Sequence, residues 1–388
     1  MTRSTREGRL FQVIARQSLS PGDAAWLKEN IPEKWDWPSV EKRAFHEGLS
    51  SLFYDHLRSL DILSALPEDM RKRLGRIYAE TSLINRHLLK VIETLEEALA
   101  GRDIKVIVYK GAALLNTVYR DPALRPMEDI DLMVREEQLD ALKETLKTMG
   151  FVQNELYPYT FSKGILSVDL HRDFISSHRI GSRREILNID AADLWKRAVP
   201  DRGSRSLYRL SLPDELAALS FHLLKHRYER LIWFVDLAEM IKNVEAAGAW
   251  PDIIVSSRRD RSERVLLYAL LLARRLIDVD VPDDVLADLG KERLARIEKY
   301  LLRLRLMNVP LGTAADILWM FQIRGAAGKI HFVLENVFPK REVMMQIFPS
   351  PSHPAGTRFR RAALVFLRVA GDLLSSMRFV LKAGLPPL

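Results

Sequence analysis

The chain has 388 residues, enough for two or three domains, and 47% hydrophobic with 28% charged residues is the composition of a folded protein. It contains no cysteine, which excludes disulfides and thiolate metal sites. No apolar run approaches the roughly 18 residues of a membrane span, and the first residues lack the apolar core of a signal peptide, so we expect a cytoplasmic protein. The net charge of +8 suits a nucleotide, a nucleic acid or an acidic membrane.

Helical periodicity dominates both ends of the chain. Residues 1–100 carry apolar positions at helical spacing, with a break at the Pro- and Trp-rich stretch 32–38. Beyond residue 212 the same spacing predicts helices at 213–228, 230–247, 262–278, 283–305, 314–337 and 357–383, with a proline-rich loop at 349–354.

The middle of the chain alternates strands and helices. The pattern predicts strands at 104–109, 129–134, 151–157, 159–163 and 166–171, and helices at 112–119 and 136–149. We therefore expect an α+β, mostly helical fold, in which a small mixed β-sheet domain is flanked by helical regions. The predicted boundaries are 1–100 for the N-terminal helical region, 101–210 for the sheet domain and 211–388 for the C-terminal helical domain.

Two aspartates one residue apart, Asp129 and Asp131, form the most informative pair in the chain. Side chains alternate along a strand, so both carboxylates point to one face while Ile130 points into the core. Two carboxylates roughly 6–7 Å apart on one face repel each other unless a cation lies between them. Hard divalent ions such as Mg²⁺ are held by one or two carboxylates plus substrate phosphates, so the pair is a candidate metal site.

Two further segments accompany the aspartates. Lys110 and Gly111 lie between a predicted strand and a predicted helix, and we expect the glycine to let the backbone turn sharply and approach a ligand. The unpaired N–H groups at the start of that helix would suit a phosphate. In the strand 166–171, alternation places Asp169 and His171 on one face.

Together these segments resemble the nucleotidyltransferase superfamily related to DNA polymerase β and, more closely, a bacterial group of uncharacterised nucleotidyltransferases. That superfamily carries a small-residue pair at a strand–helix turn, an Asp-x-Asp on the next strand and a third acid on a later strand. The matching segments here are Tyr109–Ala112, Tyr119–Pro122, Arg125, Asp129–Asp131 and Asp169–His171. Flanking matches at Ala44–Leu49, His222–His226, Trp233–Asp236 and Phe348–Ser350 extend the resemblance over most of the chain.

The resemblance implies an enzyme that uses Mg²⁺ or Mn²⁺ to move a nucleoside monophosphate from an NTP to an acceptor, releasing pyrophosphate. Asp129, Asp131 and Asp169 would be the catalytic and metal-binding residues, and Asp169 would complete the second metal site and accept the proton of the acceptor. Two ions about 3.5–4 Å apart stabilise the entering and leaving oxygens of such a displacement.

Lys110, Gly111, Ala112 and Arg125 would bind the nucleotide by the same resemblance. Ala112 departs from the superfamily, which commonly has Ser or a second Gly there, although Ala is usual in the closer group. A hydroxyl contact to the triphosphate is therefore absent. Phosphate binding would rest on backbone N–H groups, Lys110 and Arg125.

A contact with the acceptor or the base is expected from His171, His222, Lys225 and His226. The last three lie at i, i+3 and i+4 and hence on one helix face. Two histidines at this spacing can share zinc, but no acid stands between them as in His-Glu-x-x-His, which disfavours that interpretation. His171 is alternatively a partner of the aspartates or a core histidine.

Structural alternatives remain for each feature. The aspartates could form a solvated strand end, and Asp169 could be a surface acid. Asp236 is expected to position a helix or a basic neighbour such as Arg227 or Arg230. The basic and apolar stretch 358–382 suits contact with an anionic membrane, although a core-packing final helix is favoured.

Two other function classes compete with the transferase. One is a catalytically inactive nucleotide-binding or regulatory relative, against which the three retained acids argue. The other is a basic helical nucleic-acid-binding protein, disfavoured because the arginines are scattered without interleaved aromatic residues. The sequence specifies neither the acceptor (small molecule, peptide or glycan precursor), nor the NTP, nor the oligomeric state.

Overall fold

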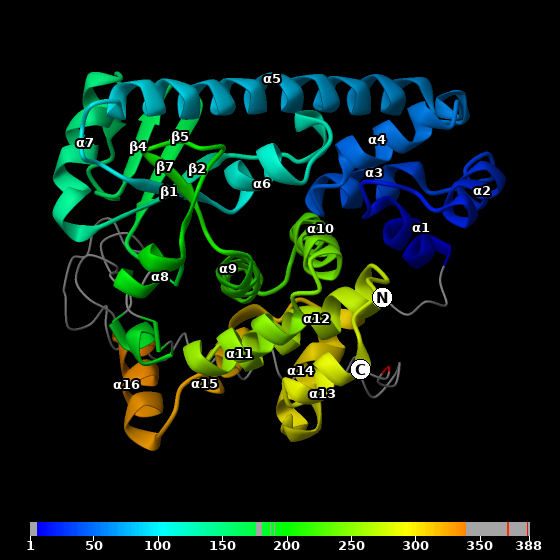
Figure 1. Cartoon of the computed structure of the whole chain (residues 1–388). Helices are drawn as coiled ribbons and strands as arrows, with labels where there is room; N and C mark the ends of the chain where they lie inside the picture. Colours follow the sequence, from blue (N-terminus) through cyan, green and yellow to red (C-terminus); the bar gives the residue numbers. More distant parts are fainter. Residues whose placement is uncertain are drawn as a thin grey trace, which may run out of the picture.

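The computed structural model describes residues 6–175, 181–186, 188–189 and 191–338, together with positions 371 and 386. Within these residues the fold is α+β and mostly helical, as predicted (Figure 1). The predicted loop at 349–354 and the match at Phe348–Ser350 lie outside the described residues, as does the predicted helix at 357–383 apart from position 371. The stretch 358–382, for which a core-packing helix was favoured over membrane contact, lies in the same region.

A seven-stranded mixed sheet occupies the middle of the described chain, in the order β3-β4-β5-β2-β1-β7-β6. β1 is antiparallel to β2 and parallel to β7, and β2 is parallel to β5. The strands are β1 Val106–Tyr109, β2 Asp129–Val134, β3 Val152–Gln153, β4 Thr160–Lys163, β5 Leu166–His171, β6 Val199–Pro200 and β7 Leu207–Arg209. This order places β1, β2 and β5 side by side at the centre.

The central strands follow from their residue types. β1 reads Val-Ile-Val-Tyr and is buried along its whole length, as a β-branched central strand should be. β2 and β5 have the predicted bounds, whereas β3 is much shorter than the predicted strand 151–157. β6 and β7 were not predicted. They are two and three residues long and depend on pairing with each other and with the edge of β1.

Helices precede the sheet, as predicted for residues 1–100. They are α1 Arg6–Ile14, α2 Pro21–Asn30, α3 Trp37–His46, α4 Ser50–Ser59 and α5 Glu68–Leu99, with a short 3₁₀ turn η1 at Leu63–Ala65. α5 is 32 residues long and runs from the sheet to the N-terminal helices along the top of Figure 1. Its buried residues, among them Leu88, Ile92 and Leu95, recur at helical spacing and face the rest of the protein.

Three helices belong to the sheet region. They are α6 Gly111–Thr117, α7 Leu139–Thr148 and α8 Ala191–Arg197, with 3₁₀ turns η2 Pro122–Leu124, η3 Glu136–Gln138 and η4 Gly181–Glu185. α6 packs against β1 and β2, so it directly follows and covers the central strands. α6 and α7 confirm the predicted helices at 112–119 and 136–149.

The C-terminal helices differ from the prediction in three places. They are α9 Leu212–Lys225, α10 Leu231–Ala246, α11 Trp250–Asp260, α12 Glu263–Leu276, α13 Asp283–Asp288, α14 Arg296–Leu306, α15 Ala315–Met320 and α16 Ala326–Val337, with 3₁₀ turns η5 Lys291–Arg293 and η6 Gly312–Ala314. The predicted helices 283–305 and 314–337 are each broken at a left-handed glycine, Gly290 and Gly325. α11 was missed, although Trp250, Ile253 and Ile254 are buried at helical spacing.

The elements fall in three successive groups, α1–α5, β1–β7 with α6–α8, and α9–α16, in line with the predicted division into domains, which stays a prediction. None of the described helices has the length and apolar character that a membrane crossing requires.

Candidate active site

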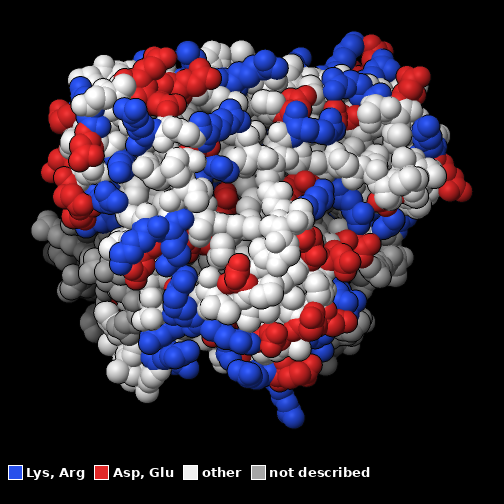
Figure 2. Space-filling view, in the orientation of Figure 1, with Lys and Arg blue, Asp and Glu red and all other residues white. Residues whose placement is uncertain are grey.

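The three predicted acids lie on one face of the central strands. Asp131 is paired with Tyr109 of β1 on one side and with Asp169 of β5 on the other. Asp129 lies two residues earlier on β2 and therefore on the same face. In Figure 2 acidic atoms lie recessed in a hollow near the centre of the face, where Figure 1 has α6, α9 and α10 converging.

The carboxylates of this face have more oxygens than hydrogen-bond donors. Asp131 Oδ1 accepts from Lys110 Nζ at 2.7 Å and from His171 Nε2 at 2.8 Å. No described residue donates to Asp131 Oδ2 or to Asp129, and Asp169 Oδ1 is buried without a partner. Buried carboxylate oxygens without donors are costly, so this donor set fits a hard cation such as Mg²⁺.

Within the described residues, no group of three or more His, Asp or Glu side chains is already arranged to hold a metal. The cation nearest Asp131 is the Lys110 ammonium, which lies 2.7 Å from it. A divalent ion would therefore require the side chains to rearrange around it.

Different surroundings separate the pKa values of the two aspartates on β2. Burial, together with the charges of Asp131 and Asp169, raises the pKa of Asp129 to about 7. Burial also raises that of Asp131, but Lys110 and His171 outweigh burial and hold its pKa well below the ordinary value. At neutral pH Asp131 is thus charged, whereas Asp129 is partly protonated.

His171 orients Asp131. Burial, with the nearby charge of Lys110, lowers the pKa of His171, so the ring is neutral at neutral pH. Because Asp131 can only accept, the proton of the ring lies on Nε2, and Nδ1 is buried without a partner. The edge of the ring packs on Tyr109, with 5.5 Å between ring centroids.

The turn between β1 and α6 differs from the expectation. The left-handed residue is Lys110 (φ 55°, ψ −136°), not Gly111. A lysine in this region of φ/ψ space costs on the order of 1–3 kcal/mol, and such strain clusters at functional sites. The strained turn brings the Lys110 ammonium back over the sheet to Asp131.

Gly111 is required for a different reason, the close approach of Arg125. A Cβ atom at position 111 would collide with Arg125 Nη1. Arg125 is itself fixed by Asp236 of α10, to which Nε and Nη2 each donate at 2.8 Å. Asp236 was expected to position a helix or a basic neighbour such as Arg227 or Arg230; its basic partner in the structure is Arg125 instead. Of the Arg125 donors, Nη1 alone lacks a described acceptor.

The loop before β2 is held by residues far away in the sequence. Tyr119 donates its hydroxyl to Asp236 Oδ1 at 2.7 Å, so Asp236 serves both Tyr119 and Arg125. Asn85, fully buried in α5, donates to the carbonyl oxygens of Pro122 (2.6 Å) and Arg125 (2.7 Å). The matching segment Tyr119–Pro122 thus positions the loop, and Asn85 was not predicted. A polar residue among the buried positions of an amphipathic helix was the available signal.

A family model described as an uncharacterised nucleotidyltransferase matches residues 33–278, more than half of the chain. The chain belongs to this family. Comparisons with curated proteins and with solved structures gave no match. The matched span contains every predicted site residue, from Lys110 to His226, as well as Asn85 and Asp236.

Two of the four residues predicted to contact the acceptor or the base, His222 and His226, form a cluster of three rings with Trp233. His222 lies 4.6 Å from His226 and 5.0 Å from Trp233 between ring centroids, and His226 lies 4.8 Å from Trp233. Burial, followed by the charge of Lys110, holds the pKa of His222 well below its usual range. Burial, with Lys225 and Lys110, lowers the pKa of His226 to about 4. The rings are therefore neutral, and Lys225 of the same helix is half-buried beside them.

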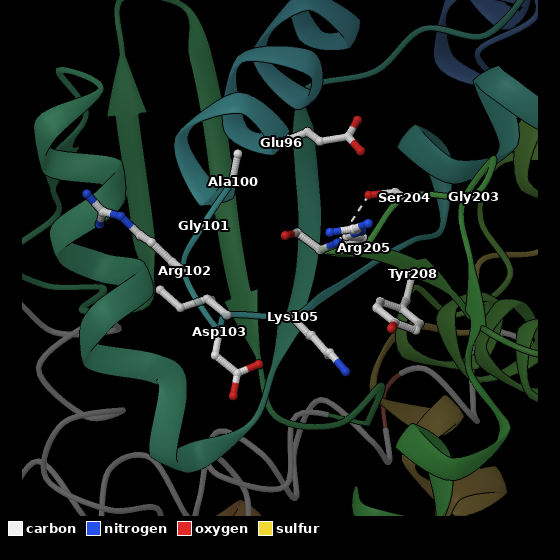
Figure 3. A pocket seen from close by; sticks show the side chains of 12 residues that line it. Glu96, Ala100, Gly101, Arg102, Asp103, Lys105, Gly203, Ser204, Arg205 and Tyr208 are labelled. Atoms are coloured by element: carbon white, nitrogen blue, oxygen red, sulfur yellow. Dashed lines mark hydrogen bonds between the residues drawn. The ribbon is translucent and has the colours of Figure 1, made fainter.

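A cavity of about 900 Å³ opens at the other end of β1 from Lys110. Figure 3 shows its walls, formed by the segment before β1, which includes Lys105, and by the turn between β6 and β7, which includes Arg205. Arg102 points away from the cavity toward α7, where it donates to Thr145 Oγ1 at 3.0 Å. None of the predicted site residues lines this cavity.

Proposed function

We propose that the protein is a Mg²⁺-dependent nucleotidyltransferase that moves a nucleoside monophosphate from an NTP to a hydroxyl or similar group of an acceptor. The observation that carries this proposal is the cluster of Asp129, Asp131 and Asp169, whose oxygens outnumber their donors, beside the strained turn at Lys110. Mn²⁺ would serve in place of Mg²⁺. When bound, the metal neutralises the triphosphate and stabilises the entering and leaving oxygens.

Lys110 has two partners in this proposal. Without nucleotide it holds Asp131 Oδ1, so it compensates the charge that the metal would otherwise compensate. Asp129, Asp131 and Asp169 would hold the metal, and Lys110 would then be free to bind the triphosphate. The backbone N–H groups of Gly111 and Ala112 and the Nη1 group of Arg125 would contact the same phosphates.

The reaction requires one residue that takes up a proton. The oxygen of the molecule that receives the nucleotide attacks the α-phosphorus. The bond between the α-phosphorus and the oxygen that bridges the α- and β-phosphates then breaks, releasing pyrophosphate. The proton of the acceptor passes to Asp169 Oδ1, which is buried and accepts no hydrogen bond from a described residue. The neutral rings of His222, His226 and Trp233 would bind the acceptor or the base by stacking.

The test is incubation with each α-labelled NTP and Mg²⁺, with candidate small molecules, peptides and glycan precursors as acceptors. We expect label transfer with release of pyrophosphate, lost with EDTA and in Asp131→Asn. Asp140→Asn, which changes an acid of α7 whose side chain is 93% exposed, is the matched control and should be fully active. A wild-type protein that binds no NTP·Mg²⁺ would overturn the proposal.

The second candidate is a relative that binds a nucleotide without transfer. The observation favouring it is the Lys110–Asp131 pair, which occupies an oxygen that a metal would use. Lys110→Met tests which role this pair has, while label transfer in the wild type separates the two candidates. If Lys110 binds the triphosphate, the affinity for NTP·Mg²⁺ falls in this variant. If Lys110 keeps the metal out, the affinity rises above that of the wild type.

A further inference from the structure

A second cavity, of about 410 Å³, lies among the C-terminal helices. Its walls come from the starts of α12 and α16, the turn after α13 and the residues that follow α15. None of its lining residues belongs to the candidate active site. Five of them are basic and one, Glu263, is acidic; the basic ones are Arg261, Arg264, Arg293, Arg324 and Lys329.

The positive charge in this cavity is poorly compensated. Arg264 donates to Glu298 at 3.0 Å. In the part of the chain that the structure describes, neither the other four cations nor Glu263 forms an ion pair. Figure 2 shows Lys and Arg side chains gathered across the lower half of this face, where Figure 1 has α11 and α15. Cations that converge in a concave space attract an anion more strongly than the same charges on a flat surface.

Two helices start at the cavity without a side-chain cap. Ser262 precedes α12 and Gly325 precedes α16, and neither supplies a side-chain hydrogen bond to the first turn. α12 has 14 residues and α16 has 12, so both have a full positive dipole end. Backbone N–H groups at such ends bind phosphate groups. They therefore add to the attraction that the arginines exert.

The cavity wall also contains a buried hydrogen-bond acceptor. Gln322 is 5% exposed and lines the cavity. Its Nε2 donates to the carbonyl of Leu318 at 3.0 Å, which fixes the orientation of the amide. Its Oε1 is buried and accepts no hydrogen bond from any described residue. A ligand with a hydroxyl group beside its negative charge would satisfy it.

We propose that this cavity binds a phosphorylated small molecule that also carries hydroxyl groups, such as a nucleotide or a sugar phosphate. Its volume falls within the roughly 300–1,000 Å³ of small-molecule sites. A nucleic acid fits less well, because the aromatic ring in the wall, Phe321, already packs against Arg264 and Lys329 and is not free to stack on a base.

The test measures binding of inorganic phosphate and ribose 5-phosphate by calorimetry, in EDTA so that the carboxylates of the sheet do not recruit metal-bound phosphate. We expect the wild type to bind both probes and Arg293→Gln/Arg324→Gln to bind them at least tenfold more weakly. Both arginines are exposed, so the variant should fold, which circular dichroism checks. Arg76→Gln/Arg86→Gln removes two exposed arginines of α5 and is the matched control, expected to bind like the wild type.

Gln322→Leu tests the hydroxyl contact separately. It should weaken binding of ribose 5-phosphate severalfold and leave the affinity for inorganic phosphate unchanged. The proposal is overturned if the wild type binds neither probe, or if binding persists in Arg293→Gln/Arg324→Gln. It is equally overturned if the wild type binds only a single-stranded oligonucleotide and the double variant loses that binding.

Discussion

Two buried pairs of a cation and a carboxylate lie beside each other at the β1–α6 turn, and they are built differently. Arg125 and Asp236 share three hydrogen bonds, and Tyr119 donates a fourth, so the carboxylate is fully satisfied. Lys110 and Asp131 share one hydrogen bond, next to acids whose oxygens lack hydrogen-bond donors. The first pair is complete without a ligand. At the second pair the negative charge of the acids is only partly compensated, so binding a cation there would be favourable.

The largest effect is expected from breaking the complete pair. Asp236→Ala leaves the Arg125 guanidinium buried without a counter-charge and should lower the free energy of unfolding by about 3–5 kcal/mol. Urea unfolding of the wild type and the variant measures this change in the free energy of unfolding. Asp280→Ala, at an exposed loop position, is the control and should change stability by less than about 0.5 kcal/mol. If Asp236→Ala lowered the free energy of unfolding as little as the control does, Asp236 would not be the counter-charge on which Arg125 depends.

Breaking the other pair should cost less and should respond to metal. Lys110→Met keeps the backbone strain and removes the charge, so in EDTA the free energy of unfolding should fall by about 2–3 kcal/mol. Mg²⁺ should restore part of the loss, because a divalent ion replaces the missing positive charge. Thermal unfolding with and without Mg²⁺ measures this difference. An equal loss in both conditions would show that the lysine is structural alone.

Removing one of the repelling acids should stabilise the metal-free protein. Folding raises the pKa of Asp129 to about 7, so the wild type loses stability as pH rises from about 4 to 7, where the unfolded chain has already released this proton. Asp129→Asn should therefore be more stable by about 1–2 kcal/mol at pH 8 and no different near pH 4. Mg²⁺ should raise the melting temperature of the wild type but not of this variant.

Glu215 of α9 has a similarly raised pKa, caused first by burial and then by Asp236 and Asp201, and it lies outside the predicted metal site. Burial raises its pKa to about 7, so its ionisation also costs stability between about pH 4.5 and 7. Glu215→Gln should raise the free energy of unfolding by about 1 kcal/mol at pH 8 and leave it unchanged below pH 4.5. Unfolding curves of the wild type and the variant at the two pH values, each with and without Mg²⁺, measure this difference in stability. An effect that depends on Mg²⁺ would tie Glu215 to the metal site.

The strands that carry the acids could be predicted because their signal is local. Asp-Ile-Asp-Leu and Ser-Val-Asp-Leu-His alternate within the strand itself, and β2 and β5 have the predicted bounds. The family resemblance rested on the same short segments, and the family is confirmed. The roles of individual residues in binding and catalysis stay predictions.

Contacts between distant residues could not be predicted in this way. The partner of Arg125 lies 111 residues further on, and a closer arginine was the natural expectation for Asp236. The same limit applies to the turn at Lys110, because a Lys-Gly pair points to glycine as the left-handed residue. The collision that Gly111 avoids involves an arginine from another loop. β6 and β7 exist through pairing alone, and neither has enough residues for a periodic signal.

The two hydrogen bonds that Asn85 donates limit where the chain can be shortened. A shortened chain starting at residue 101 would retain every acid of the sheet, yet the carbonyl groups of Pro122 and Arg125 would lose their donor. The loop that carries Arg125 to Gly111 would then be held from one side. The sheet is therefore not a portable module, and any transplant of the candidate site has to bring α5 with it.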